Sequence, residues 1–313
     1  MIVFLACSGM MVECYSDPLR PLFVDKKGFD ELRSYFELRW FDGHTLPVYG
    51  RTFFFDSGAF SAWSQGEPVD RLLYAKFLEK YAKFMTYYAN LDAIPSNTSP
   101  EGYRKSAQDT LDNQKFLEDH GLQPVPVFHK GEPFEFLEMY VEKYPYICLG
   151  GLVSDATAGT NKEFFDFVWA RFLTKPDGTP KTKVHAFGTT GQTHLLNYPW
   201  FSADSSTWLI QSKTGCICVP KKKDGQWDYN VRPHLVAVSD RSSFRGTDGE
   251  HFDTMPKSIQ DEIVKYVIER GCTMENVCTL PQWRFVINWY YWLEFAEKAK
   301  FQTTFKKRQV EFV

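Results

Sequence analysis

Short apolar runs that end in small or polar residues alternate along the chain with segments of helical periodicity. The runs are rich in β-branched and aromatic residues, which is typical of buried strands. Seven of them predict strands, at residues 2–6, 52–55, 87–91, 125–128, 146–149, 184–187 and 200–203. Residues 235–239 are a candidate eighth strand.

The segments between the runs predict helices. The clearest is residues 99–121, which begins with Ser99 and Pro100 and stops at Gly121. Further helices are expected at residues 28–40, 70–86, 133–143 and 162–173. Residues 214–231 predict a β-hairpin between strands 7 and 8, turning at Lys223-Asp224-Gly225. Two later helices, 256–270 and 281–300, are expected to close and cover the barrel.

This alternation predicts an α/β fold, a (β/α)8 TIM-type barrel with C-terminal helices and a hairpin insertion between strands 7 and 8. In such barrels the active site lies at the carboxyl ends of the strands. No linker, charge block or internal repeat divides the sequence. Residues 1–313 are therefore expected to form a single domain, with residues 302–313 as a C-terminal tail.

Composition limits the kinds of partner that the protein can bind and the compartment in which it is expected. The formal net charge of −3 gives no global field that would attract a polyanion, so a nucleic acid would have to be held by a local basic patch. The apolar N-terminal run is too short to span a bilayer and lacks a preceding basic region. Seven cysteines in a long chain suit reduced thiols. A soluble, cytoplasmic protein with no membrane partner is expected.

Polar and glycine residues that follow the predicted strands are the candidates for chemistry. They are Asp56, Asp92, His129, Gly150, Gly151, Gly188 and Asp204. Because parallel strands end on one rim, the three aspartates are expected to converge in one pocket. Two carboxylates can share the work of capturing an anomeric carbon and moving the proton of the leaving group. On these residues alone a sugar hydrolase fits as well as base exchange, and a single aspartate could instead cap the following helix.

Four segments in a fixed order make the prediction sharper: DSGAF at 56–60, LGGL at 149–152, HAFG at 185–188 and SADSS at 202–206. Together they resemble the tRNA-guanine transglycosylase superfamily, and most of all its short DNA-guanine transglycosylases encoded by bacteriophages. The resemblance spans about residues 50 to 210 and depends on the whole series. It implies a pentosyltransferase that exchanges guanine in DNA for a free 7-deazaguanine base such as preQ0, through a covalent aspartate–deoxyribose intermediate.

The resemblance also implies a role for each matching residue. Asp204 would be the nucleophile and Asp56 the general base. Phe60 and Phe187 would cover the two faces of the purine. Asp92 would accept hydrogen bonds from N1 and the exocyclic amine, which a guanine-type edge offers and an adenine-type edge does not. The rest of the implied base-binding set is Ser57, His129, Gly150, Gly151 and Leu152.

A histidine at position 129 departs from the family pattern, which has another polar base-reading side chain there. His185 is expected to be a packed residue of the barrel, outside the catalytic set.

Zinc is the one metal that the resemblance raises. The tRNA-type enzymes bind it with a Cys-x-Cys pair, a third cysteine and a distant histidine. Here Cys216 and Cys218 form the pair, but Lys221 stands where the third thiolate should be. Residues that could complete four ligands in space are His234, Cys272 and Cys278. Zinc is therefore possible but not expected, and no other cofactor is implied.

The remaining question is which nucleic acid, DNA or tRNA, is the substrate. The chain has no separate RNA-binding extension, which favours DNA over the alternative of tRNA. Phosphate contacts would come from three basic clusters, namely Lys221-Lys222-Lys223, Arg241 with Arg245, and Lys306-Lys307-Arg308. A non-exchanging glycosidase and a catalytically silent nucleic-acid-binding barrel stay open as alternatives.

Overall fold

The computed structural model describes residues 1–6, 29–46, 48, 50–152, 158–189, 191–242 and 249–306. Its internal contacts divide the chain into two compact units. The first comprises Met1–Met11, Gly28–Asp204 and Gln302–Val313, and the second Val12–Lys27 and Ser205–Phe301. Compactness alone does not make a unit an independent domain. The interpretation of residues 1–313 as one domain therefore stays a prediction.

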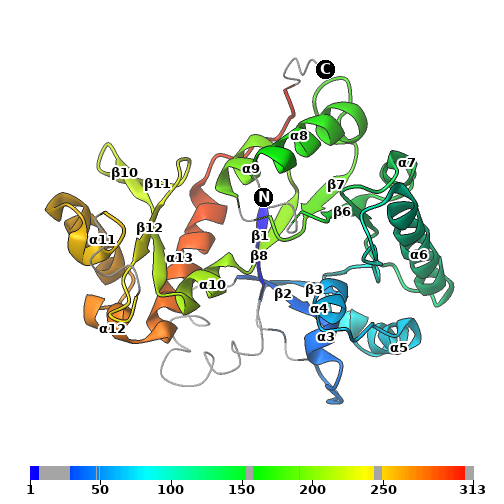
Figure 1. Cartoon of the computed structure of the whole chain (residues 1–313), viewed down its shortest axis with the longest axis horizontal. Coiled ribbons are helices and arrows are strands. Elements are labelled where there is room, and N and C mark those ends of the chain that lie inside the picture. The colour runs from blue at the N-terminus through cyan, green and yellow to red at the C-terminus, as the bar shows by residue number, and fades with distance from the viewer. Residues whose placement is uncertain are drawn as a thin grey trace. The chain divides into compact units, whose positions relative to one another are not determined.

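The strands of the first unit form one curled, eight-stranded sheet (Figure 1). They are β1 (Ile2–Ala6), β2 (Asp30–Ser34), β3 (Thr52–Asp56), β4 (Tyr87–Tyr88), β5 (Val127–His129), β6 (Tyr146–Gly150), β7 (Lys183–Ala186) and β8 (Ser202–Ser205). Their order in the sheet is β4-β3-β2-β1-β8-β7-β6-β5. A parallel bridge between Ala89 and Val125 joins the two ends of this order. The predicted α/β fold with the strand order of a (β/α)8 TIM-type barrel is confirmed.

Helices follow the strands in alternation. The helices of the first unit are α3 (Tyr35–Leu38), α4 (Ala59–Ser64), α5 (Arg71–Tyr81), α6 (Pro100–Asp119), α7 (Phe134–Lys143), α8 (Ala158–Val168) and α9 (Gln192–Asn197). The predicted helix 99–121 is confirmed as α6. The Ser99 hydroxyl accepts a hydrogen bond from the Gly102 N–H at 3.0 Å, and Pro100 occupies the first turn. Gly121, with φ of +75°, follows its end.

Strand β2 corrects the helix predicted over residues 28–40, of which only the single turn α3 is helical. All of β2 is buried, although three of its residues are charged. Asp30 pairs with Arg51 at 2.9 Å, and Glu31 pairs with Arg33 at 2.7 Å. Because paired charges can be buried, this strand lacks the apolar pattern by which strands are recognised.

The second unit contains the hairpin and the C-terminal helices. Strand β9 (Cys216–Val219) pairs antiparallel with β12 (His234–Ala237), and β10 (Lys221–Lys223) pairs antiparallel with β11 (Gln226–Asp228). The helices are α10 (Thr207–Lys213), α11 (Lys257–Glu269), α12 (Met274–Thr279) and α13 (Pro281–Lys298). The predicted hairpin is confirmed, with positive φ at both turn residues, Asp224 and Gly225. The helices predicted at 256–270 and 281–300 are confirmed as α11 and α13.

The position of the hairpin along the chain differs from the prediction. Residues 235–239 are not the eighth barrel strand, because β12 pairs only with β9 in a separate two-stranded sheet. Because β2 was not predicted, the number of each later strand rises by one, and the predicted seventh strand is β8, the eighth strand of the barrel. The hairpin therefore follows strand 8 instead of lying between strands 7 and 8.

The centre of the barrel is filled by one hydrophobic cluster. Strands β1, β2, β3, β5 and β6 and the Ala89–Val125 bridge contribute buried side chains to it, and Phe187 and Phe201 pack against it from the residues next to β7 and β8. The buried members are Phe4, Leu32, Phe54, Ala89, Val125, Val127, Tyr146 and Cys148. A filled interior leaves the rim of the barrel as the place for a site. Among the described helices, none combines the length and apolar character that crossing a bilayer requires.

Candidate active site

The predicted chemical residues lie at the carboxyl ends of the barrel strands. Asp56 is the last residue of β3, His129 the last of β5, and Asp204 lies next to the end of β8. Asp92 follows the bridge that links β4 to β5. The Asp56 carboxyl group lies within electrostatic reach of both Asp92 and Asp204. The expected convergence of three aspartates is therefore present in the first unit.

The buried His129 imidazole lies between two carboxyl groups, those of Asp92 and Glu132. His129 Nε2 lies 2.9 Å from Asp92 Oδ2, and its Nδ1 lies 3.4 Å from Glu132 Oε1. Burial works to lower the pKa of His129, but hydrogen bonds and charge attraction to the two carboxylates raise it to about 10. Burial likewise works to raise the pKa of Asp92, yet the contacts with His129 and the Ser57 hydroxyl lower it overall. At neutral pH His129 is a cation and Asp92 an anion.

Helix α6 and the DSGAF segment hold Asp92 in place. The Thr110 hydroxyl accepts a hydrogen bond from the Ala93 N–H at 2.9 Å, and the Asn113 amide donates to the Leu91 carbonyl at 2.9 Å. Ser57 donates its hydroxyl to Asp92 Oδ1 at 2.8 Å. Ser57 is fully buried, so it is positioned to orient Asp92 from behind.

Asp56 carries the opposite perturbation. Burial, followed by the negative charges of Asp92 and Asp204, raises the pKa of Asp56 to about 8. The Gly58 N–H donates to Asp56 Oδ2 at 3.1 Å and opposes part of this rise. Gly58 has φ of +71°, and a Cβ there would lie 2.6 Å from the Phe36 Cβ. The turn that presents Asp56 therefore requires glycine, and at pH 7 the carboxyl group is mostly protonated.

Asp204 is held from two sides. The Gly188 N–H donates to Asp204 Oδ1 at 2.7 Å, from a glycine whose φ is +59°. His185 Nε2 lies 3.4 Å from the same oxygen. His185 is fully buried and stacks on Phe54, with ring centroids 4.7 Å apart. The packing expected of His185 is confirmed, and its contact with Asp204 is an addition to that expectation.

The Gly150-Gly151 turn lies beside His129. A Cβ at position 150 would meet the His129 ring at 2.5 Å, so only glycine lets the imidazole lie across the end of β6. Gly151 has φ of +71° and is exposed. Leu152 is buried, and its carbonyl accepts a hydrogen bond from the Asn161 amide at 2.9 Å. Of the predicted base-edge residues, Gly151 is thus the one that faces solvent.

The two aromatic residues predicted to stack on a purine have different surroundings. Phe60, on α4, is 51 % exposed, and its ring lies 6.0 Å from that of Trp63, which is 54 % exposed. Phe187 is half-buried and packs edge-on against His185, with ring centroids 4.6 Å apart. The exposed ring is thus that of Phe60, shortly after Asp56 in the sequence. The packed ring is that of Phe187, next to His185.

Three site residues escaped the sequence reasoning. Glu132 lies three residues after His129 on the turn before α7, and that spacing after a strand-end histidine was its only signal. Ser202 and Tyr146 contact His185 through a chain of buried hydroxyl groups. Small and aromatic residues inside predicted strands carry no pattern that separates such contacts from packing.

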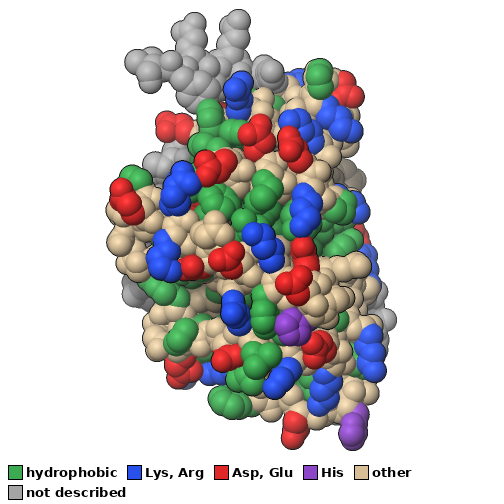
Figure 2. All heavy atoms as spheres, turned by 90° about the vertical axis from the view of Figure 1, so that its right-hand side faces the viewer, with side chains coloured by type: hydrophobic (Ala, Val, Ile, Leu, Met, Phe, Trp, Pro, Cys, Tyr) green, Lys and Arg blue, Asp and Glu red, His purple; other side chains and the backbone are tan. Residues whose placement is uncertain are grey.

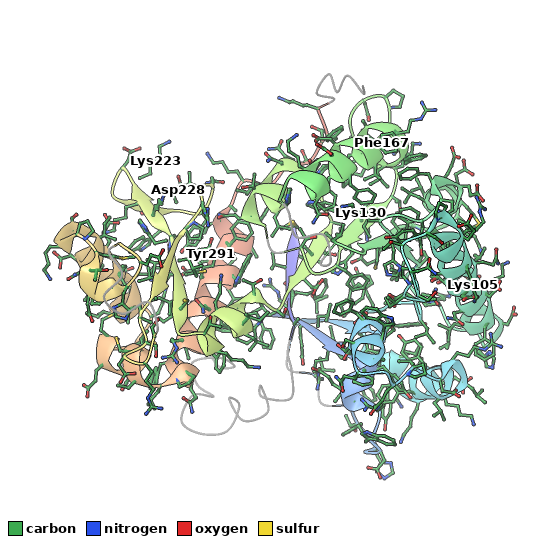
Figure 3. All side chains as sticks on the ribbon, viewed as in Figure 1. Lys105, Lys130, Phe167, Lys223, Asp228 and Tyr291 are labelled. Carbon is green, nitrogen blue, oxygen red and sulfur yellow. The ribbon has the colours of Figure 1, made fainter. Side chains whose placement is uncertain are left out.

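The predicted basic residues belong to the second unit or to the C-terminal tail. Lys221 and Lys223 are exposed on the hairpin, where Figure 3 labels Lys223. The Lys222 ammonium lies 4.7 Å from the centre of the Trp227 ring. Arg241 and Lys306 are exposed. The predicted contacts Arg245, Lys307 and Arg308 lie outside the described residues.

The Cys216 and Cys218 pair lies on β9 of the second unit. Burial raises the pKa of Cys216 and raises that of Cys218 to about 12. Cys218 Sγ lies 3.1 Å from the Gln211 side-chain oxygen and donates to it. Within the described part of the chain, His, Cys, Asp and Glu form no group of three placed to bind a metal ion.

Comparison with known proteins adds no family: no protein-family model matches the chain, and no curated protein matches it.

Proposed function

We propose that this chain exchanges guanine in DNA for a free 7-deazaguanine base, such as preQ0, through a covalent bond between Asp204 and deoxyribose. The observation that supports it most is the buried Asp56 carboxyl group, whose pKa is about 8, within electrostatic reach of Asp204. Base exchange needs one acid that holds its proton at neutral pH and a second acid that attacks the sugar. Paired acids at a barrel rim suit this division of labour.

In the first step, Asp204 attacks C1′ of deoxyguanosine as the C1′–N9 bond breaks. The departing guanine takes the Asp56 proton, so a sugar ester of Asp204 and an ionised Asp56 remain. The oxocarbenium-like transition state carries positive charge, which the neighbouring carboxylates stabilise.

In the second step, the incoming 7-deazaguanine loses its N9 proton to Asp56. N9 then bonds to C1′ as the ester bond to Asp204 breaks, which restores both acids. One glycosidic bond replaces another, so the exchange consumes neither an energy source nor a redox cofactor.

Base selection is assigned to Asp92. Ser57 and His129 each contact a different Asp92 oxygen, and a carboxylate has about four acceptor sites. It can therefore also accept from N1 and the exocyclic amine of a guanine-type base. His129 supports this task because its positive charge holds Asp92 in the acceptor-only form. Protonation of Asp92 would convert one acceptor into a donor.

The polymer must present an extruded or unpaired nucleotide, because a duplex hides C1′ and the base edge. Exposed Phe60 and Trp63 offer aromatic surface that can offset part of the lost base stacking. The face in Figure 2, which includes α6, shows Lys and Arg interspersed with Asp and Glu. Mixed charges attract a polyanion weakly, so the hairpin lysines are the assigned phosphate contacts.

Labelled preQ0 offered together with DNA and with tRNA tests the proposal and its nearest alternative. We expect label in DNA with the unaltered protein, none with Asp204→Asn, and normal incorporation with Asp119→Asn, an exposed aspartate at the end of α6. Label in tRNA alone would replace DNA by RNA as the polymer. Label in neither polymer would refute base exchange and return the site to the glycosidase or simple binding alternatives.

A further inference from the structure

A chain of buried polar groups leads from the barrel interior to Asp204. The Tyr146 hydroxyl lies 2.6 Å from Ser202 Oγ, and Ser202 Oγ lies 2.8 Å from His185 Nδ1. His185 Nε2 then faces Asp204 Oδ1 at 3.4 Å. Ser202 and His185 are fully buried, and Tyr146 is nearly so. The base-exchange steps above do not use the first three of these residues.

The positions of the hydrogen atoms in this series of polar groups follow from the groups at its two ends, Tyr146 and Asp204. If Tyr146 donates to Ser202, then Ser202 donates to His185 Nδ1, and the ring proton must lie on Nε2. The opposite direction would place the ring proton on Nδ1 and turn the Nε2 lone pair toward the Asp204 carboxylate, which is repulsive. Nε2 lies 3.4 Å from Asp204 Oδ1 but makes no hydrogen bond of good geometry among the described residues, so a proton on Nε2 is favoured by the attraction between the N–H dipole and the nearby carboxylate. Burial raises the pKa of Tyr146 well above its usual value, which keeps the hydroxyl able to donate.

We infer that Tyr146, Ser202 and His185 form a relay that positions the nucleophile by holding an Nε2–H beside Asp204 Oδ1. The inference rests on the proposed role of Asp204. The Gly188 N–H donates to that same oxygen at 2.7 Å. Two donors on Oδ1 leave Oδ2 as the oxygen that attacks C1′.

The surrounding rings fix the direction of the Nε2–H. The His185 ring stacks on Phe54 with an interplanar angle of 21° and meets Phe187 edge-on at 80°. The 3.4 Å separation is longer than an ordinary N–H···O bond, so the contact with Asp204 acts through charge–dipole attraction. His185 keeps its proton throughout and is a positioning residue. When the ester bond breaks in the second step, negative charge returns to Asp204, and the two donors stabilise it.

The test combines a tautomer measurement with a rate. Nitrogen-15 NMR of histidine-labelled protein reports which His185 nitrogen carries the proton, and single-turnover release of guanine from DNA reports the first chemical step. The variants are Ser202→Ala and Tyr146→Phe. The matched control is Tyr87→Phe, because the Tyr87 ring packs against Tyr146 at 5.0 Å and its hydroxyl is not part of the relay.

We expect the relay to place the His185 ring proton on Nε2 in the unaltered protein. Ser202→Ala should give a mixture of tautomers and slow guanine release about tenfold, the effect of about one hydrogen bond. Tyr146→Phe should act in the same direction, and Tyr87→Phe should change neither readout. Because members of one network are not additive, the Tyr146→Phe/Ser202→Ala double variant should be no slower than Ser202→Ala.

A proton on Nδ1 in the unaltered protein would overturn the relay. So would a Ser202→Ala protein that releases guanine at the same rate as the control. Failure of the unaltered protein to release guanine from either polymer would overturn the proposed function, and with it the role given to the relay. A variant that melts at the same temperature as the control excludes general unfolding as the cause of a slower rate.

Discussion

The carboxylate of half-buried Asp92 and the imidazole of buried His129 lie 2.9 Å apart on the barrel rim. Their pairing raises the pKa of His129 and lowers that of Asp92, whereas the pKa of Asp56 is raised to about 8. One rim thus carries both an anionic carboxylate and a neutral carboxyl group. Opposite perturbations of like groups are the usual sign of divided acid and base roles.

Replacing Asp92 by Ala should reduce the affinity for preQ0 and guanine by orders of magnitude. Two purine donors would lose their acceptor in a buried site, at about 1–3 kcal/mol for each unmade bond. Calorimetric titration measures the affinity. The Asp92→Asn protein keeps the side-chain shape and should also bind weakly, and unchanged affinity in both variants would limit Asp92 to holding His129.

The same Asp92 variants should lower the pKa of His129 from about 10 toward its ordinary value. A histidine with a raised pKa stabilises the fold fully below the unfolded pKa of about 6.5, and this contribution is lost as the pH rises to the folded value. The drop in melting temperature caused by Asp92→Ala should therefore be smaller near pH 10 than at pH 6. A histidine NMR titration measures the pKa directly, with Glu132→Gln as a second variant that should shift it in the same direction.

Replacing Asp56 by Asn should abolish exchange and stabilise the fold at neutral pH. The folded protein retains a proton on Asp56 that the unfolded chain releases above about pH 4, so stability falls as the pH rises between about 4 and 8. Asparagine removes this fall, whose slope is at most about 1.4 kcal/mol per pH unit. Melting temperatures of the two proteins should agree near pH 4 and separate progressively up to pH 8. Parallel curves would show that Asp56 titrates normally.

Phe60 is expected to contribute to binding of unpaired DNA with little effect on stability. Its ring is half exposed, so Phe60→Ala leaves the core intact, while base stacking on an aromatic ring contributes about 1–3 kcal/mol. Leu73→Ala is the matched control, because Leu73 is 55 % exposed and has no aromatic face. Fluorescence anisotropy with a single-stranded oligonucleotide should show weaker binding for Phe60→Ala alone. Equal losses in the two variants would argue against stacking.

Lys223 is expected to contact phosphate. Removing one phosphate contact should weaken DNA binding uniformly across sequences and reduce the slope of log affinity against log salt by about one. Lys105 on α6 is a suitable control, because it is exposed and pairs with Asp109 (Figure 3). Lys223→Gln should change the salt slope, and Lys105→Gln should not. If neither changes it, the hairpin is not part of the DNA interface.

Much of the barrel could be predicted from the sequence, because most strands are apolar runs that end abruptly at a polar residue. The runs at 52–55 and 146–149 correspond to β3 and β6 within one residue. Strand β2 could not be found in this way, since its charges are neutralised by partners such as Arg51 that only the fold brings near. One missed strand then placed the hairpin one position too early.

The candidate site, too, could be predicted only as far as the pattern of strand ends reaches. Strand ends identified Asp56, Asp92, His129 and Asp204, because the rim of a barrel collects them whatever the loops do. Their charge states could not be predicted, since these depend on contacts such as Glu132 with His129. The buried Tyr146–Ser202 contact gave no signal either, because both residues lie inside strands.

The most direct test of the account is to map the covalent intermediate. The protein is incubated with guanine-containing DNA without a free base, quenched with acid, digested and examined by peptide mass spectrometry. The account predicts a deoxyribose-linked adduct on the peptide that contains Asp204, which disappears in Asp204→Asn and is discharged when preQ0 is added before the quench. An adduct on another residue, or base exchange by the Asp204→Asn protein, would contradict the central claim.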